Sequence, residues 1–199
     1  MNNNSRMDTF DTIEIRRPDL ARSYLGLLKA QPGRPIALFA PRRVGKTFFL
    51  DHDLTPLAKK SVLLPVYADV CNGNAIIAAL RAVIHKRKSE VAAVFTGSSQ
   101  SGLAKIMSTT GAPMYQFAQL LDFPALGDDY LQELSEHFAR IHRGRKPKLD
   151  DLKVLFARIG FKPALMKDIV KSMSAEGLTD VEMALKHYIA SQDASKVEK

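Results

Sequence analysis

One short loop constrains the fold of this chain more than any other feature. It lies between two apolar runs, at 36–39 and 48–50, and reads Ala40-Pro41-Arg42-Arg43-Val44-Gly45-Lys46-Thr47. This order predicts a buried strand, a tight turn and the start of a helix. The segment fits the pattern G-x-x-x-x-G-K-[ST] at every position except the first, where Ala40 stands in place of glycine.

The pattern predicts a binding site for phosphate groups. Backbone N–H groups of such a loop, and of the helix that follows, converge on an anion. The Lys46 ammonium would reach the terminal phosphates, and the Thr47 hydroxyl would ligate Mg²⁺. Alanine at the first position would be strained by about 1 kcal/mol if the turn needed a positive φ there, and would cost little in extended backbone. The predicted nucleotide contacts are Ala40, Pro41, Arg42, Arg43, Val44, Gly45, Lys46, Thr47 and Phe48.

Composition narrows the class of protein. A chain of 199 residues, 46% of them apolar, forms one domain or one domain and a small lobe. Its single cysteine, Cys71, excludes a disulfide framework and is expected to be a buried thiol. No apolar run has the length of a membrane span and the first residues are polar, so we expect a cytoplasmic protein without membrane partners. The net charge of +8 favours polyanionic partners, nucleic acid among them.

Hydrophobic periodicity divides the chain into an α/β part and a helical part. Strands are expected at 36–39, 61–69 and 91–95, and helices at 18–30, 46–59 and 76–86, with Pro56 bending or ending the second helix. Only helices are expected later, at 128–142, 149–159, 163–173 and 179–192. The predicted organisation is a flexible N-terminus (1–12), a core (13–126), a helical lobe (127–192) and a flexible tail (193–199).

Several segments together resemble one family. They are the loop with its strand, the stretch 49–56, the stretch 66–70, Val94-Phe95-Thr96-Gly97-Ser98-Ser99-Gln100, and the stretch 112–117. The chain is similar, over most of residues 33–190, to bacterial AAA-type ATPases of the predicted archaeal-ATPase or STAND-like kind. These belong to the P-loop NTPase superfamily, and alanine also occurs at the first loop position in that family.

The resemblance implies further roles. Lys46 and Thr47 would bind ATP phosphates and Mg²⁺, and the end of the strand at 91–95 corresponds to the sensor-1 region. A polar residue there contacts the γ-phosphate or the attacking water, and the candidates are Thr96 and Ser98. The helical lobe would act as a lid over the nucleotide. AAA relatives often assemble and place an arginine in the neighbour's site, so a homo-oligomer or another protein partner is also implied.

One part of the family pattern is missing from this sequence. The family carries a Walker B strand, which ends in Asp-Glu and supplies an Mg²⁺ ligand and a group that polarises water. The interval between Val70 and Val91 has room for a short helix but contains no such strand. The resemblance then implies a natural degenerate paralogue, an internally deleted form or an edited sequence. We expect a P-loop core with a reduced, three-stranded parallel sheet and a helical lid lobe.

Other acidic groups are candidates to replace the missing one. Asp69 ends the expected second strand and could hold Mg²⁺, as an aspartate does in small-molecule P-loop kinases, or it could be an ordinary turn residue. Asp51 and Asp53 lie on the helix after the loop and are expected to face solvent or to cap local structure. Tyr115 and Phe117 could approach an adenine, but packing in the core is the preferred interpretation.

The basic residues of the loop and of two later clusters each have more than one possible role. Arg42 and Arg43 could contact phosphate or a neighbouring subunit, or could simply face solvent. Basic clusters at 85–88 and 140–148 could contact nucleic acid, although solvated faces are the commoner use of such runs.

Together these observations predict an ATP-binding protein that uses Mg²⁺. Hydrolysis is the activity of the family, and we expect it to be slow or absent because the Walker B segment is missing. Two alternatives remain: a non-catalytic interaction module on an ATPase scaffold, and a small-molecule kinase that uses Asp69.

Overall fold

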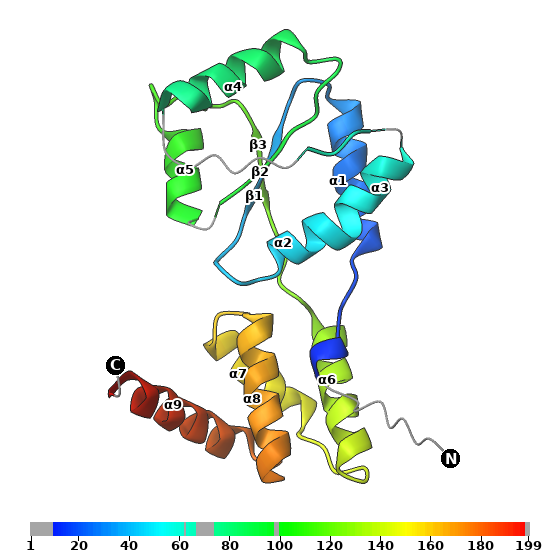
Figure 1. The fold of residues 1–199 in the computed structure, drawn as a ribbon, viewed down its shortest axis with the longest axis vertical. Helices are drawn as coiled ribbons and strands as arrows, with labels where there is room; N and C mark the ends of the chain where they lie inside the picture. The colour runs from blue at the N-terminus through cyan, green and yellow to red at the C-terminus, as the bar shows by residue number, and fades with distance from the viewer. Residues whose placement is uncertain (1–9, 62, 67–73, 98–99, 198–199) are drawn as a thin grey trace. The chain divides into compact units, whose positions relative to one another are not determined.

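The computed structural model describes residues 10–61, 63–66, 74–97 and 100–197. The chain divides into two compact units, each of which is described by itself (Figure 1). Residues 16–124 form the first, which we call the α/β unit. Residues 1–15 and 125–199 form the second, which we call the helical unit.

A parallel sheet lies at the centre of the α/β unit. Its described strands are β1 (Ile36–Phe39), β2 (Val94–Thr96) and β3 (Gln119–Asp122), in the order β2-β1-β3. Leu38 of the central strand lies level with Thr96 on one side and with Leu121 on the other. The α/β class and a parallel sheet of three strands, both expected from the sequence, are therefore confirmed for the described residues, although one of the three strands is not the one expected.

The strands are not all those that the sequence predicted. The expected strand at 61–69 is wrong for residues 63–66, which form no strand, while residues 62 and 67–69 lie outside the described part. Leu64 is 89% exposed and Val66 82% exposed. Between them stands Pro65, which cannot donate a ladder hydrogen bond. The third strand is β3, formed by the short run Gln-Leu-Leu-Asp. This strand was not predicted from the sequence.

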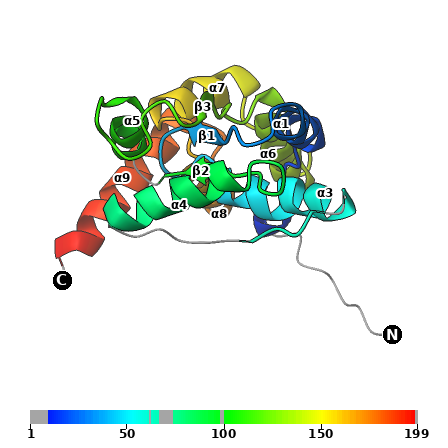
Figure 2. The ribbon, with the colours of Figure 1, turned by 90° about the horizontal axis from the view of Figure 1, so that it is seen from above.

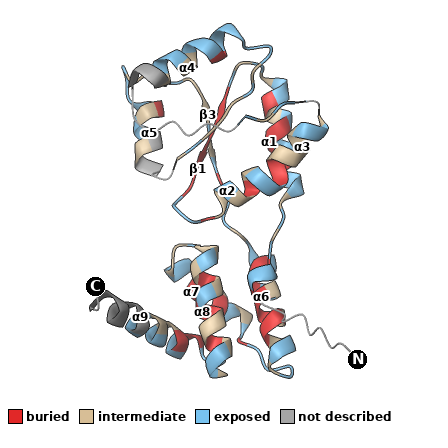
Figure 3. Cartoon of the chain, viewed as in Figure 1, coloured by how far each residue is buried: buried red, intermediate tan, exposed pale blue. Residues whose placement is uncertain are grey.

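Helices cover both faces of the sheet. Ile36 and Leu38 of β1 pack with α1 (Pro18–Ala30) and the helix after the loop. Ala37 and Phe39 point to the opposite face, where α4 (Asn74–Lys86) and α5 (Gln100–Ser108) supply the apolar partners. Figures 1 and 2 show α1 and α3 on one side of the strands and α5 on the other. All four residues of β1 are buried, as expected for a central parallel strand (Figure 3).

A continuous helical run follows the loop. It comprises α2 (Lys46–Phe49), a π-helical stretch η2 (Leu50–Leu54) and α3 (Thr55–Lys60). Pro56 has no N–H to donate to the carbonyl four residues earlier, and the wider π turn lies just before it. The predicted helix with a disturbance near Pro56 is confirmed, whereas α5 was not predicted.

The helical unit has a core of its own. It contains η1 (Phe10–Thr12), α6 (Asp128–Ile141), α7 (Leu149–Arg158), α8 (Pro163–Glu176) and α9 (Val181–Val197). Phe10 is only 5% exposed and packs in this core, so residues 10–12 are ordered although the sequence predicted a flexible segment there. Helix α9 likewise continues past its expected end at 192. No helix among the described residues combines the length and the apolar character that a membrane crossing requires.

Gly33 fixes the turn that leads into β1, and a side chain there should destabilise the α/β unit. Its φ is +78°, and an added Cβ would lie 2.2 Å from Cβ and 3.1 Å from Cα of Lys88. We expect Gly33→Ala to lower the free energy of unfolding by about 2–4 kcal/mol, from the left-handed backbone and the overlap together. Urea denaturation measures the change.

Gly26 provides the matched control for this substitution. It lies on the exposed side of α1, where an added Cβ would meet nothing within 4 Å. Gly26→Ala should therefore stabilise the unit by about 0.5–1 kcal/mol. An unfolding midpoint for Gly33→Ala equal to that of the wild type would contradict the contact with Lys88.

Candidate functional site

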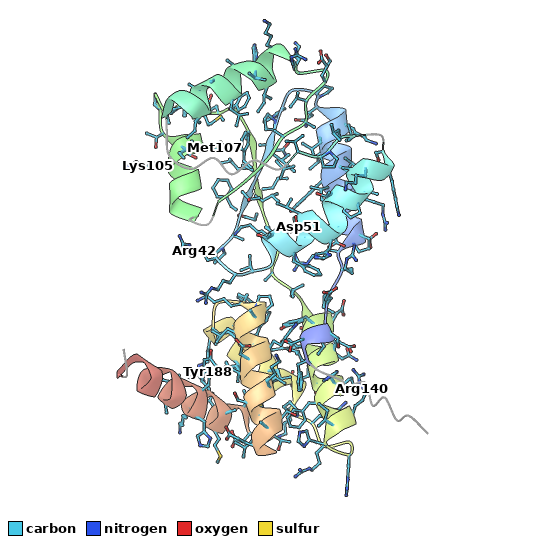
Figure 4. All side chains as sticks on the ribbon, viewed as in Figure 1. Arg42, Asp51, Lys105, Met107, Arg140 and Tyr188 are labelled. Atoms are coloured by element: carbon cyan, nitrogen blue, oxygen red, sulfur yellow. The ribbon has the colours of Figure 1, made fainter. Side chains whose placement is uncertain are left out.

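The predicted loop leaves the carboxyl end of the central strand. Ala40 is 5% exposed and Val44 is 3% exposed, and both pack in the core between β1 and α1. Ala40 does not belong to the residues with positive φ. Its backbone therefore suits alanine, and the departure from the glycine pattern costs little. Figure 4 shows Arg42 on the exposed part of the loop and Asp51 on the helical run that follows.

Gly45 makes the turn from the loop into the helix. Its φ is +94°, which favours glycine, and the N–H of Phe49 donates to its carbonyl at 3.0 Å to begin the helix. An added Cβ at Gly45 would meet nothing within 4 Å, so the need for glycine is conformational. Arg43 also has a left-handed backbone, with a φ of 66°, although it is not glycine. Such a conformation costs on the order of 1–2 kcal/mol and is commonest at functional loops.

Several N–H groups of the loop are open to an anion. Among the described residues, the backbone N–H groups of Arg43, Val44 and Gly45 donate no hydrogen bond. Those of Lys46, Thr47 and Phe48, at the start of the helix, have no partner within the helix. Unpaired N–H groups in a turn at a helix N-terminus carry partial positive charge, so they attract phosphate oxygens.

The Lys46 side chain folds back over this loop. Its Nζ donates hydrogen bonds to the carbonyl oxygens of Ala40, at 2.8 Å, and Pro41, at 2.9 Å. Burial lowers the pKa of the Lys46 ammonium below the ordinary lysine value. Within the described part of the chain the ammonium is thus held at the loop by neutral acceptors, and an arriving phosphate would offer it a stronger, charged acceptor.

The ends of the two flanking strands lie at the same edge of the sheet as the loop. Thr96 ends β2 and is exposed. It lies level with Leu38, one residue before β1 ends at Phe39. Asp122 ends β3 and is exposed, level with Phe39 of β1. Asp122 was not predicted as a site residue, because the short strand β3 that it ends was not predicted. The signal that could have found it is an acidic residue directly after a short apolar run, Leu120-Leu121. Ser98 lies outside the described residues.

The acidic groups predicted from the sequence have different outcomes. Asp69 lies outside the described residues, as does Cys71. Asp51 is exposed, as predicted. Asp53 is not solvent-facing: its side chain is 2% exposed and accepts a hydrogen bond from Arg16 Nε at 2.7 Å. The described part of the chain holds no group of three or more His, Cys, Asp or Glu residues that could bind a metal ion.

The two aromatic residues that the sequence offered as possible adenine contacts, Tyr115 and Phe117, come before the start of β3 and not at the carboxyl edge that holds the loop. Phe117 packs against the apolar cluster of Phe39 and Met107, and the Arg81 guanidinium lies 5.2 Å from the centre of its ring. Arg81 also donates to the Pro113 carbonyl at 2.8 Å, which holds the segment before β3. The predicted packing role is therefore confirmed for Phe117, while Tyr115 is only partly buried.

The basic segment 140–148 lies in the helical unit beside a hollow of about 470 Å³. The residues that line the hollow are Ile141, His142, Arg143 and Arg145. His142 stacks on Phe138 and contacts the Ser174 hydroxyl at 2.8 Å, so its ring is held in place. The described residues of the lining include no carboxylate or thiol, and they offer no acid–base pair for catalysis.

No protein-family model matches this chain, and no curated protein or solved structure matches it either. The candidate site is therefore defined by its own residues. It consists of the loop at 40–47, with Thr96 on one flanking strand and Asp122 on the other.

Proposed function

We propose that this protein binds ATP with Mg²⁺ at the loop 40–48, as an AAA-type P-loop NTPase does. The observation that carries the proposal is the Lys46 ammonium, held at the loop by two carbonyl oxygens beside N–H groups that donate to nothing else in the described chain. The cationic side chain and these N–H groups belong to consecutive residues of one loop and helix start. A triphosphate is the ligand that both would bind.

The place of the loop in the sheet supports the same ligand. β1 is central, and the chain passes first to β2 on one side and then to β3 on the other. In open α/β sheets, ligands bind outside the carboxyl ends of the strands where the chain order reverses. The loop 40–45 leaves β1 at that point.

The residues present are suited to magnesium with phosphate. Mg²⁺ prefers oxygen ligands and usually takes one or two from the protein, the rest coming from phosphate and water. The Thr47 hydroxyl follows Lys46 on the exposed start of the helix, and the Asp122 carboxylate ends the neighbouring strand. We assign these two groups to the metal, with Asp69 as the alternative acid.

Hydrolysis in this protein is slow. No strand is found in the described residues between β1 and β2. The described residues there therefore offer no strand end with an acidic pair that could polarise water. Thr96 offers a hydroxyl near the γ-phosphate but not a base. Binding and cleavage are thus separable in this chain, because the binding groups are present and the water-polarising glutamate is missing.

A binding titration run in parallel with a turnover assay tests the proposal. We expect saturable binding of ATP that strengthens with Mg²⁺, and release of phosphate far below the ~1 s⁻¹ at the lower end of common enzyme rates. Absence of binding at millimolar ATP would refute the binding site. Turnover at an ordinary rate, lost in Lys46→Ala, would refute the slow hydrolysis alone.

The lowered pKa of Lys46 makes ATP affinity depend on pH. The charged ammonium binds phosphate, so affinity is full below this lowered pKa and is lost as the pH rises through it. We expect the Kd for ATP to increase by up to about tenfold per pH unit above it. The Lys46→Ala variant should bind weakly and lack this alkaline loss. Wild-type affinity that stays constant until ordinary lysines titrate would contradict the assignment.

A further inference from the structure

The excess of positive over negative charge in this protein lies in one of its two units. Residues 16–124, the α/β unit, contain 15 Lys and Arg and only 6 Asp and Glu. The rest of the chain contains 14 Lys and Arg and 15 Asp and Glu. A polyanion would therefore be attracted to the α/β unit and not to the helical unit.

Two basic turns meet at the amino edge of the sheet. The turn before β1 carries Arg34. Lys86 ends α4, and Arg87 and Lys88 follow it in the turn before β2. The turns touch where Gly33 packs against the backbone and Cβ of Lys88. Because the strands are parallel, this edge is opposite to the one that holds the loop 40–47. We call Arg34, Lys86, Arg87 and Lys88 the amino-edge patch.

The charges of this patch are exposed and little neutralised. All four side chains belong to exposed residues. Arg87 pairs with Glu90 at 3.0 Å, whereas Arg34, Lys86 and Lys88 form no ion pair with any described residue. Backbone hydrogen bonds from Glu90 and Val91 to the Arg87 carbonyl hold the second turn in shape. The patch thus consists of four exposed cationic side chains, one of which pairs with the carboxylate of Glu90.

The surroundings of the patch distinguish between anionic partners. Residues 29–34 and 86–90 include no aromatic residue and no exposed large apolar side chain. A membrane-binding surface usually combines cations with apolar or aromatic side chains, and single-stranded nucleic acid is usually held by stacking on aromatic rings. The phosphate backbone of a duplex needs only cations in a fixed arrangement.

We infer that the amino-edge patch binds the phosphate backbone of double-stranded nucleic acid without sequence preference. The basic segment 140–148 is a weaker candidate, because Arg140 and Lys146 there pair with Glu133 and Glu136 in a unit without excess positive charge. The inference does not depend on ATP binding, which uses the opposite edge of the sheet.

Binding of a short, labelled, random-sequence DNA duplex to the full chain tests this inference. Fluorescence anisotropy at several salt concentrations gives both the Kd and its salt dependence. The Arg34→Ala/Lys86→Ala/Lys88→Ala variant should raise the Kd roughly 10- to 100-fold and lower the slope of log K against log salt by about 0.9 per lost contact. The single Lys86→Ala variant should lower the slope by about 0.9.

Three controls keep the result specific. Arg143→Ala/Arg145→Ala/Lys148→Ala removes the same charge from the helical unit and should leave duplex binding within about twofold. Lys46→Ala should also leave it unchanged, which separates this surface from the ATP site. Circular dichroism shows that each variant is folded.

The inference is overturned if the patch variant binds the duplex as the wild type does, or if the helical-unit variant is weakened as much. It is also overturned if phosphatidylserine vesicles bind through the patch and the duplex does not, since the partner would then be a membrane.

Discussion

Lys46→Ala should weaken ATP binding roughly 10- to 150-fold, which corresponds to the loss of about 1.5–3 kcal/mol from a charge-assisted contact. The structure explains the size of the effect. Lys46 is partly buried at the loop and, among the described residues, its ammonium donates only to two carbonyl oxygens, so it is available to phosphate. Isothermal titration with Mg²⁺ and ATP measures the change.

Lys59 is the matched control for this prediction. It lies on the same helical run but at its exposed far end, in the last turn of α3. Lys59→Ala removes the same charge from the unit and should leave the Kd for ATP within about twofold, because exposed charges at that distance are screened. Equal affinity in Lys46→Ala and the wild type would show that ATP does not bind at this loop.

Arg16→Ala should destabilise the α/β unit more than Asp53→Ala, although both remove the same ion pair. The Asp53 side chain is 2% exposed and that of Arg16 is 51% exposed. Asp53 Oδ2 already lacks a hydrogen-bond partner among the described residues. Removing Arg16 leaves a buried carboxylate without its cation, at a cost of about 2–3 kcal/mol. Removing Asp53 leaves an arginine that water can reach, at a cost of about 1 kcal/mol.

Denaturant unfolding of the two variants measures this asymmetry. Arg22→Ala serves as the control, since Arg22 pairs with Asp19 in an exposed ion pair and its loss should change stability by no more than about 0.5 kcal/mol. Equal losses for Arg16→Ala and Asp53→Ala would contradict the burial of the carboxylate.

Local patterns predicted most of the elements of this fold. The helices α1, α6, α7 and α8 begin at the residues expected from apolar periodicity, and α1 also ends there. β1 and the following helix were recognisable because a fully buried strand and a Gly-Lys-Thr turn both leave strong local signals. β3 was missed because an edge strand of four residues, half of them exposed, has too little periodicity.

The candidate site was predictable only in part. Its loop follows from sequence, because a phosphate cradle is built from consecutive residues. The neighbours of the loop do not, because they depend on which strands pair with β1. Asp122 became a candidate only once β3 was found beside β1. Asp53 was expected at the surface because charge alone suggests exposure, but its burial depends on Arg16, 37 residues away.

The central claim is that this chain holds ATP and does not cleave it at an ordinary rate. The most direct measurement is to mix an excess of protein with a limiting amount of Mg²⁺ and ATP, follow the bound fraction by equilibrium titration, and identify the nucleotide over time by chromatography after acid quenching. We predict bound, intact ATP with the wild type and a much smaller bound fraction with Lys46→Ala. Recovery of ADP within seconds, or no binding by the wild type at millimolar ATP, would contradict the claim.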